Sequence, residues 1–372
     1  MSITFIHTAD WQLGKPFGNF PEEKQAVLRA ARLDAIDRIA AVAGAAGARH
    51  VLVAGDVFDK AKPGQRVIGE LLARLGKHRE IVWHLLPGNH DPAQPGCVWD
   101  DVARSRPPGN VRLHVTTDAA EIEGGVLLIP APLHAKAMST DPTAFMDQVV
   151  SPRGTIRIGM AHGSVHGFNS IGEASIPIAA TRASSAKLDY FALGDWHGQV
   201  EINPRTWYSG TPEPDGHKDN KPGHVLVVSI AAQGAIPTVR AVPTHHFQWR
   251  HHALALSCVD DLEAFAARLD GDAVARDRLV LKLDVAGRVP LAEFGVVKQV
   301  LDAMAYGMGH LDADVTALAA GTDADDLAAL GTGSIGLIAQ RLAAMSASDD
   351  AGERQTSARA LRELAKHVGQ PS

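Results

Sequence analysis

The chain has 372 residues, more than one hydrophobic core usually holds, so its length favours two domains or one large domain with an appendage. With 45% hydrophobic and 21% charged residues, its composition is that of a soluble globular protein and excludes wholesale disorder. The formal net charge of −6 gives no globally positive field, so any contact with nucleic acid has to come from a local basic patch.

Two further features of the sequence predict a cytoplasmic protein that does not enter the membrane. No apolar run reaches the roughly 18 residues of a membrane span, and the N-terminus lacks the pattern of a signal peptide. The two cysteines, Cys97 and Cys258, stand in no metal-ligand spacing and suit a reducing compartment.

Short apolar runs rich in β-branched residues alternate with helical patterns over the first two thirds of the chain. This rhythm predicts a layered α/β fold. Expected strands cover 3–7, 50–54, 81–86, 126–129, 156–160 and 190–193, the first helix covers 22–46, and hairpins are expected around 206–208 and 224–230. The strands are almost continuously apolar, as a sheet covered on both faces requires.

The pattern changes after about Pro243, and we place a domain boundary there, so that the first domain spans 1–245. A small α+β capping or accessory domain is expected over 246–345, with helices at 261–269 and 291–306 and a half-buried strand at 278–285. The remaining residues, 346–372, are expected to form a polar linker and a short amphipathic helix at 356–368 that packs on its own chain.

Five polar clusters each follow an expected strand. They cover 8–12, 55–59, 88–91, 161–163 and 194–197. In an open α/β sheet, the loops beyond the carboxyl ends of the strands converge on one crevice, so we expect these clusters to meet. Carboxylate, amide and imidazole groups bind pairs of manganese, iron or zinc ions, and the sequence therefore predicts a two-metal site. Each cluster taken singly is equally compatible with a turn or a buried histidine.

The order of these clusters resembles the calcineurin-like metallophosphoesterase superfamily, which implies a layered α/β/β/α sandwich. Within that superfamily, HTADWQLGKPF, VLVAGDVFDK and LLPGNHDP resemble the SbcD-type DNA repair nucleases, and the similarity covers roughly residues 3–245. The resemblance implies that Asp56 bridges two divalent metal ions. The first ion would be held by Asp10, Gln12 and His197, and the second by Asn89, His162 and Asp195.

The resemblance also assigns catalysis to His90 and Asp91. His90 would face the substrate and stabilise charge at phosphorus or protonate the leaving oxygen. Asp91 would orient His90, and Asp59 would support the site from behind the ligands. The implied reaction is hydrolysis of a phosphodiester without a covalent enzyme intermediate.

Two residues depart from the family's pattern. Gln12 stands where the family commonly has a histidine, and Asp195 replaces the first histidine of the last motif. Both place oxygen where imidazole nitrogen is usual, so we expect manganese to be preferred over zinc or iron. The same departures resemble the stand-alone bacterial MPE endonucleases associated with Lhr-Core-type helicases, which implies cleavage of single-stranded DNA without an SbcC-type ATPase partner.

Four residues are candidate DNA contacts, namely Trp11, Lys15, Phe17 and Arg182. An aromatic ring beside a cation can stack a base while the cation meets phosphate. For a tryptophan between metal ligands, packing inside the loop is the alternative. A further group, His245, His246, His251 and His252, would either hold an extra metal ion or face solvent or a partner.

The residues alone leave several functions open. Besides an endonuclease acting on single-stranded DNA in repair, the chain is compatible with an SbcD-like 3′–5′ exonuclease, a phosphodiesterase of small molecules or cyclic nucleotides, and a catalytically decayed DNA-binding scaffold. The resemblance further suggests a homodimer and a functional association with a helicase or ligase.

Overall fold

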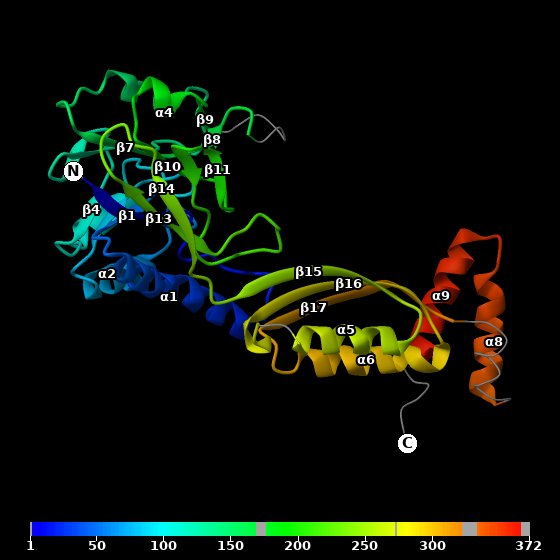
Figure 1. The fold of residues 1–372 in the computed structure, drawn as a ribbon. Helices are drawn as coiled ribbons and strands as arrows, with labels where there is room; N and C mark the ends of the chain where they lie inside the picture. Colours follow the sequence, from blue (N-terminus) through cyan, green and yellow to red (C-terminus); the bar gives the residue numbers. More distant parts are fainter. Residues whose placement is uncertain (1, 169–175, 272–273, 322–332, 366–372) are drawn as a thin grey trace. The chain divides into compact units, whose positions relative to one another are not determined.

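The computed structural model describes residues 2–168, 176–271, 274–321 and 333–365 (Figure 1). The chain divides into two compact units. The first consists of Met1–Pro214 with Lys218–His246, and the second of Asp215–His217 with Phe247–Ser372. Each unit has a hydrophobic core of its own.

The first of two six-stranded sheets in the first unit is built mainly from parallel strands. Its strand order is β14-β13-β1-β2-β3-β4. The bounds are β1 (Ile3–Thr8), β2 (His50–Val53), β3 (Val82–Leu85), β4 (Val111–Leu113), β13 (His224–Ile230) and β14 (Thr238–Pro243). Strands β1 to β4 are parallel, whereas β13 pairs antiparallel with both β1 and β14.

The second sheet has the order β11-β12-β10-β7-β6-β5. Its bounds are β5 (Ala120–Glu123), β6 (Val126–Ala131), β7 (Ile156–His162), β10 (Tyr190–Gly194), β11 (Val200–Asn203) and β12 (Thr206–Tyr208). The four central strands are parallel, and antiparallel β5 and β11 lie at the edges. A separate two-stranded sheet pairs β8 (Ser164–Val165) with β9 (Pro177–Ile178).

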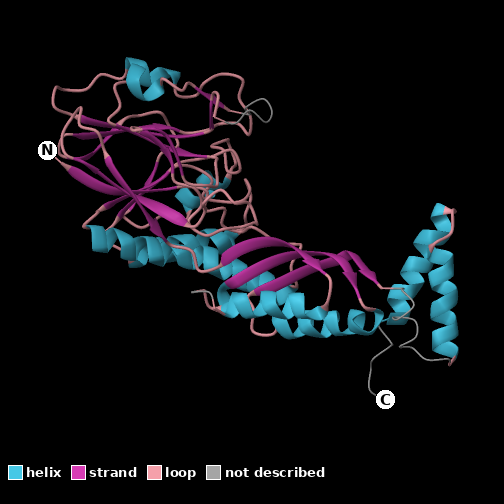
Figure 2. Ribbon diagram, turned by 45° about the vertical axis from the view of Figure 1, so that its right-hand side comes forward, coloured by secondary structure: helices cyan, strands magenta, loops and turns pink. Residues whose placement is uncertain are grey.

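The two sheets pack face to face around a layer of apolar side chains that includes Phe5, Leu52 and Ile158 (Figure 2). The outer face of the first sheet is covered by α1 (Glu22–Ala46), α2 (Gln65–Lys77) and α3 (Val98–Arg104). The second sheet is covered by η1 (Ala144–Gln148) and α4 (Arg182–Ser185). This layering confirms the predicted α/β fold class.

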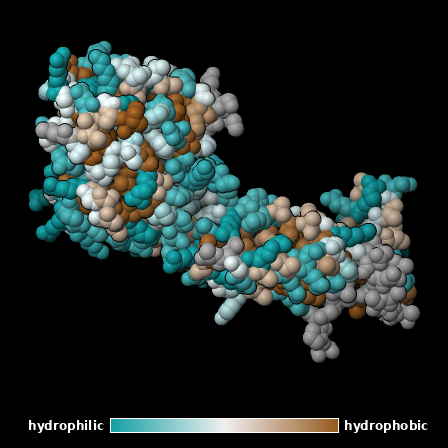
Figure 3. All heavy atoms as spheres, viewed as in Figure 1, coloured by the Kyte–Doolittle hydropathy of each residue, from teal (hydrophilic) through white to brown (hydrophobic). Residues whose placement is uncertain are grey.

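Helix α1 begins and ends where the sequence predicts. Leu28, Ile36, Ile39 and Ala43 recur at helical spacing and are buried against the first sheet. The helix ends at Gly47, whose φ of 64° is the left-handed conformation that glycine adopts most easily. Hydrophilic residues gather over α1 and α2 on the visible face (Figure 3). In the part of the chain that the structure describes, no helix is both long and apolar enough to cross a membrane.

The second unit contains a parallel three-stranded sheet in the order β15-β16-β17. Its elements are β15 (Gln248–Leu256), α5 (Val259–Asp270), η2 (Arg276–Arg278), β16 (Leu279–Val289), α6 (Leu291–Ala305), β17 (His310–Ala320), α8 (Ser334–Ser346) and α9 (Ala351–Ala365). Helices α5 and α6 cover one face of the sheet (Figure 1). Each pair of parallel strands is thus joined by a helical crossover, as parallel pairing requires.

Several elements differ from the sequence-based expectation. The elements α2, β15, β17 and α8 were not predicted, and the polar stretch expected as a linker contains the start of α9. Asp350 explains that start, because its carboxylate accepts the backbone N–H groups of Gly352 at 2.7 Å and Glu353 at 3.1 Å. The predicted end of the helix, 366–368, lies outside the described residues.

Three of the four histidines predicted as a possible extra metal site have partners within their own unit. His251 and His252 are consecutive on β15, so their side chains lie on opposite faces of the sheet. His251 binds Asp284 at 2.6 Å, while the ring of His252 packs against Phe265. The Nδ1 atom of His245 donates to the carbonyl oxygen of Gly223 at 3.1 Å.

Three other histidines form a buried row across the first sheet. His84 Nε2 lies 3.0 Å from His50 Nδ1, and His84 Nδ1 lies 2.9 Å from His114 Nε2. Burial lowers the pKa of all three, and that of His114 falls to about 4. The folded protein therefore binds fewer protons than the unfolded chain between about pH 4 and pH 6.5, so its free energy of unfolding decreases as the pH falls through this window.

Between pH 7 and pH 5, we expect the difference in free energy of unfolding between His114→Gln and the wild type to shift by about 2 kcal/mol in favour of the variant, because one buried neutral histidine is removed. Urea unfolding followed by tryptophan fluorescence measures this, since Trp249 is the only one of the six tryptophans outside the first unit. Equal losses in the two proteins would contradict the prediction.

Candidate metal centre

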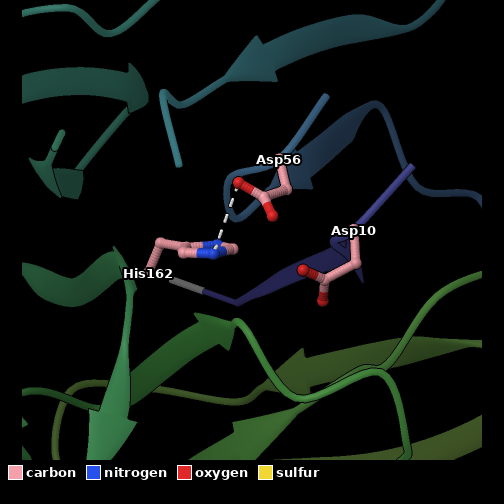
Figure 4. A group of neighbouring side chains, drawn as sticks. All are labelled: Asp10, Asp56 and His162. Atoms are coloured by element: carbon pink, nitrogen blue, oxygen red, sulfur yellow. Dashed lines mark ion pairs between the residues drawn. The ribbon is translucent and has the colours of Figure 1, made fainter. Parts of the chain in front are cut away.

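The candidate site lies at the carboxyl ends of parallel strands from both sheets. Asp10 and Asp56 follow β1 and β2, and His162 is the last residue of β7. All three side chains are buried, and their donor atoms lie within 4.8 Å of one another. Figure 4 shows the two carboxylates and the imidazole turned toward a common space. Among the described residues, no other group of three or more His, Cys, Asp or Glu side chains comes this close.

Four candidate ligands stand on a left-handed backbone. The φ angles are 55° at Asp10, 43° at Gln12, 51° at Asp56 and 105° at Asp195. Residues other than glycine avoid this region, and such strain is concentrated at functional sites. Backbone hydrogen bonds hold the first two loops together, because Asp10 N donates to Gly55 O at 3.1 Å and Gln12 N donates to Asp56 O at 2.9 Å.

Two glycines make room for the ligands. A Cβ atom at Gly55 would overlap the ring of His162, and one at Gly88 would overlap the carboxylate of Asp56. The φ of 94° at Gly55 adds a second reason for glycine at that position. The glycines that open the clusters 55–59 and 88–91 are therefore required by close packing at the site.

His162 lies at the centre of one group of predicted ligands. Its Nδ1 donates to the carbonyl oxygen of Ala54 at 2.9 Å, which leaves Nε2 facing the cluster. Nε2 is 3.0 Å from Asn89 Oδ1, 3.5 Å from Asp56 Oδ1 and 3.9 Å from Asp195 Oδ1. The residues predicted to hold the second ion thus lie together beside Asp56.

Asp10, Gln12 and His197 form the other group. The carboxylate of Asp10 accepts the backbone N–H of Asp195 at 3.2 Å. Gln12 Nε2 donates to His197 Nε2 at 3.1 Å, while Gln12 Oε1 accepts from Lys15 Nζ at 3.3 Å. The side-chain oxygen of Gln12 therefore points to Lys15, and binding an ion next to His197 through this oxygen requires the amide to turn over.

Burial and mutual repulsion raise the free energy of the ionised carboxylates in this site. Burial raises the pKa of Asp10 to about 6, against the opposing charges of His162 and His197. Burial alone would lower the pKa of His162, but the carboxylates of Asp56, Asp10 and Asp195 outweigh it and raise that pKa to about 9. Divalent cations stabilise ionised carboxylates and compete with the proton on imidazole. The donor set and its charge therefore fit a pair of divalent cations.

His90 lies beside the cluster and reaches the surface. Its side chain is 39% exposed, and its Nε2 is 3.9 Å from Asp56 Oδ2. Its Nδ1 donates to the backbone carbonyl oxygen of Asp59 at 2.8 Å. The support predicted for Asp59 thus comes from its carbonyl group, which orients His90 and leaves Nε2 available for chemistry.

The prediction that Asp91 orients His90 is wrong. The carboxylate of Asp91 is buried and accepts backbone N–H groups of Phe58 at 2.9 Å and Gly88 at 2.6 Å. Burial raises the pKa of Asp91 to about 8, and the charge of Asp56 acts in the same direction. Asp91 therefore holds the loops after β2 and β3 together and does not touch the imidazole through its side chain.

Three of the four predicted DNA contacts are wrong because the side chains are buried. Trp11 is 2% exposed and Phe17 is 6% exposed. Arg182 is also buried and forms an ion pair with Asp141 at 2.9 Å. Lys15 is only partly buried at the edge of the site and stays a candidate.

Sequence reasoning missed Arg32, which holds the first metal loop in place. Its buried guanidinium group donates to the carbonyl oxygens of Asp10 at 3.0 Å, Trp11 at 2.8 Å and Glu213 at 3.0 Å. The signal was present in the sequence, because Arg32 stands four residues after Leu28 within the apolar stripe of α1. An arginine in a buried helix face needs such partners.

Comparison with known proteins shows what the first part of the chain is similar to. A search of curated proteins found no match. Among solved structures, the crystal structure of the protein TT1561 of Thermus thermophilus is similar with a TM-score of 0.42 and 13% sequence identity, covering 66% of this chain and 100% of that chain. Residues 3–174 match the family described as calcineurin-like phosphoesterase. The first part of the chain is therefore similar to the calcineurin-like phosphoesterases.

Proposed function

We propose that the protein is a two-metal phosphodiesterase that cleaves single-stranded DNA internally. The observation that carries the proposal is the meeting of two donor groups beside Asp56, with His90 exposed at their edge. One group is Asp10, Gln12 and His197, and the other is Asn89, His162 and Asp195. Asp56, shared between the two groups, would hold two divalent cations, which would supply charge neutralisation at the phosphate.

The chain's own residues prepare the site for this reaction. When bound, divalent cations neutralise the phosphate and activate water for in-line attack. Ala54 fixes the ring of His162 through its carbonyl oxygen, and Asp59 fixes the ring of His90 in the same way. Because Nδ1 of His90 is engaged, its Nε2 is the atom that would bind the phosphate or protonate the leaving oxygen.

Accessibility favours a polymeric substrate over a small diester. The side chains of His90 and Asp195 are 39% and 27% exposed, so the edge of the site is open to a strand that passes over the surface. A DNA strand can pass over an open edge without presenting a free end to the site, which favours internal cleavage over the 3′–5′ exonuclease alternative. Dimerisation and association with a helicase or ligase stay predictions.

Manganese is the ion that we propose. Asp195 adds an oxygen donor near His162 and Asp56, and carboxylate oxygen suits manganese better than zinc. Gln12 contributes a neutral amide where a second imidazole would favour a softer ion.

We expect His90→Ala to lower kcat for bis-p-nitrophenyl phosphate by roughly 10²–10⁴-fold, the typical contribution of a general acid or base. Manganese affinity should stay close to that of the wild type, because His90 is not among the proposed ligands. His78→Ala is the control, since His78 lies before β3 at the opposite edge of the sheet and binds Asp37. Near-normal turnover of His90→Ala would refute the role of this residue.

Manganese should stabilise the protein more at pH 8 than at pH 5.5. Without metal, the pKa values of Asp10 and His162 are raised, so the folded state holds protons that the unfolded chain has already lost. The free energy of unfolding therefore decreases as the pH rises from the ordinary pKa of each group to its raised pKa, which is about 6 for Asp10 and about 9 for His162. At a hundredfold excess over Kd, each bound ion adds about 2.7 kcal/mol. Thermal melts with and without manganese measure this, and an equal shift at both pH values would contradict it.

Single-stranded circular DNA should be opened in the presence of manganese, because a circle has no end from which an exonuclease can begin. Gel electrophoresis of the circle beside a linear strand of the same sequence measures the reaction. Degradation of the linear strand with an intact circle would favour the exonuclease, and hydrolysis of bis-p-nitrophenyl phosphate without cleavage of either DNA would favour a small-molecule phosphodiesterase.

A further inference from the structure

A hollow of about 370 Å³ adjoins the candidate metal centre. Its size is near the lower end of pockets that bind small molecules, roughly 300 Å³. Three segments that are far apart in the sequence line it, namely Phe168, the stretch Trp196, Gln199 and Val200, and residues 219–221. Trp196 stands between Asp195 and His197, so one wall of the hollow is a metal-binding loop.

The aromatic wall of the hollow is anchored to the second sheet. The rings of Trp196 and Phe168 are perpendicular, with centroids 5.4 Å apart, and Phe168 stacks on Tyr208 at 5.5 Å. Tyr208 is fully buried, and its hydroxyl donates to the carbonyl oxygen of Gly163 at 2.7 Å. The indole N–H of Trp196 has no hydrogen-bond partner among the described residues, so ring contacts hold this side chain.

Comparison with Trp11 shows that Trp196 packs against the core with only part of its surface. Both tryptophans stand between two predicted metal ligands, but Trp11 is 2% exposed, and its indole N–H donates to Thr8 Oγ1 at 3.0 Å. Trp11 also packs edge-on against Trp83 in the core. Trp196 is only half-buried and presents its surface to the hollow.

The opposite wall adds a cation. Lys221 is exposed, and its carbonyl oxygen accepts the backbone N–H of Gln199 at 3.2 Å, which ties the two walls together. Asp219 lies on the same wall and would repel a phosphate group inside the hollow. Two aromatic rings with one lysine suit a flat ring that is attached to a phosphate outside it.

From this arrangement we propose that the hollow binds the nucleobase of a nucleotide whose phosphate lies at the metal centre. The base stacks on the indole ring of Trp196 and meets the perpendicular ring of Phe168 edge to face, and Lys221 attracts the phosphate. This inference rests on the proposed phosphodiesterase function and adds the site at which one base of the substrate is recognised.

Calorimetric titration of the manganese-loaded full chain tests the proposal. The two ligands are thymidine 5′-monophosphate and 2-deoxyribose 5-phosphate, in which a hydroxyl group at C1 replaces the base. We expect the nucleotide to bind about tenfold more tightly, within the range for one stacked base. Trp196→Ala should bring the ratio of the two affinities close to one, and Trp196→Phe should keep most of it.

Lysine variants provide an independent measurement with a matched control. Lys221→Ala should weaken binding of both ligands several-fold. Lys187→Ala should leave both affinities unchanged, because Lys187 is exposed and precedes β10, at the end of the strand away from the site. The control is matched, because φ is 53° at Lys187 and 58° at Lys221, so both alanines carry the same backbone strain.

Two results would overturn the proposal. One is equal affinity of the wild type for both ligands, and the other is an equal loss of both affinities in Trp196→Ala, which would mean that the indole only supports the metal loop. Calorimetry requires no turnover, whereas failure of the wild type to hydrolyse bis-p-nitrophenyl phosphate with manganese would contradict the phosphodiesterase function itself. The two failures are therefore distinguishable.

Discussion

The carboxylates of Asp10, Asp56 and Asp195 share one largely buried space, and their mutual repulsion has to be balanced. The protonated imidazole of His162 balances part of this charge, and divalent cations would balance it fully. Much of the local structure serves to hold these groups together against repulsion. Left-handed backbone turns aim the side chains inward, and Arg32 fixes the first loop through two of its backbone carbonyl oxygens while also binding that of Glu213.

The sequence predicts the scaffold of the site well, because each metal cluster directly follows a buried strand with a clear apolar pattern. Helix α1 was predicted with its bounds, whereas β15 and β17 were not, since polar residues and alanine, which are poor strand formers, occupy most of their positions. The start of α9 was taken for a linker because its polar residues include the capping Asp350. Partners distant in sequence could not be foreseen either, which is why Arg182 was expected at the surface.

Roles within the site depend on backbone groups that a sequence motif does not reveal. Asp91 was expected to orient His90, but a backbone carbonyl does so, and Asp91 instead binds two backbone N–H groups. The match to the phosphoesterase family ends at residue 174, while Asp195, His197 and two of the three segments that line the hollow come later in the chain. Two proposed metal ligands, Asp195 and His197, and the aromatic residue of the proposed base-binding hollow, Trp196, thus lie together in the loop 194–197.

The number of manganese ions bound per chain tests the two-metal site most directly. Metal analysis of the protein after removal of free ion, together with electron paramagnetic resonance, should give two ions per chain with the signal of a magnetically coupled pair, because Asp56 is proposed to bridge them. In Asp56→Ala the coupled signal should be lost. A single uncoupled ion in the wild type would contradict the account, since Asp56 would then have no second ion to bridge.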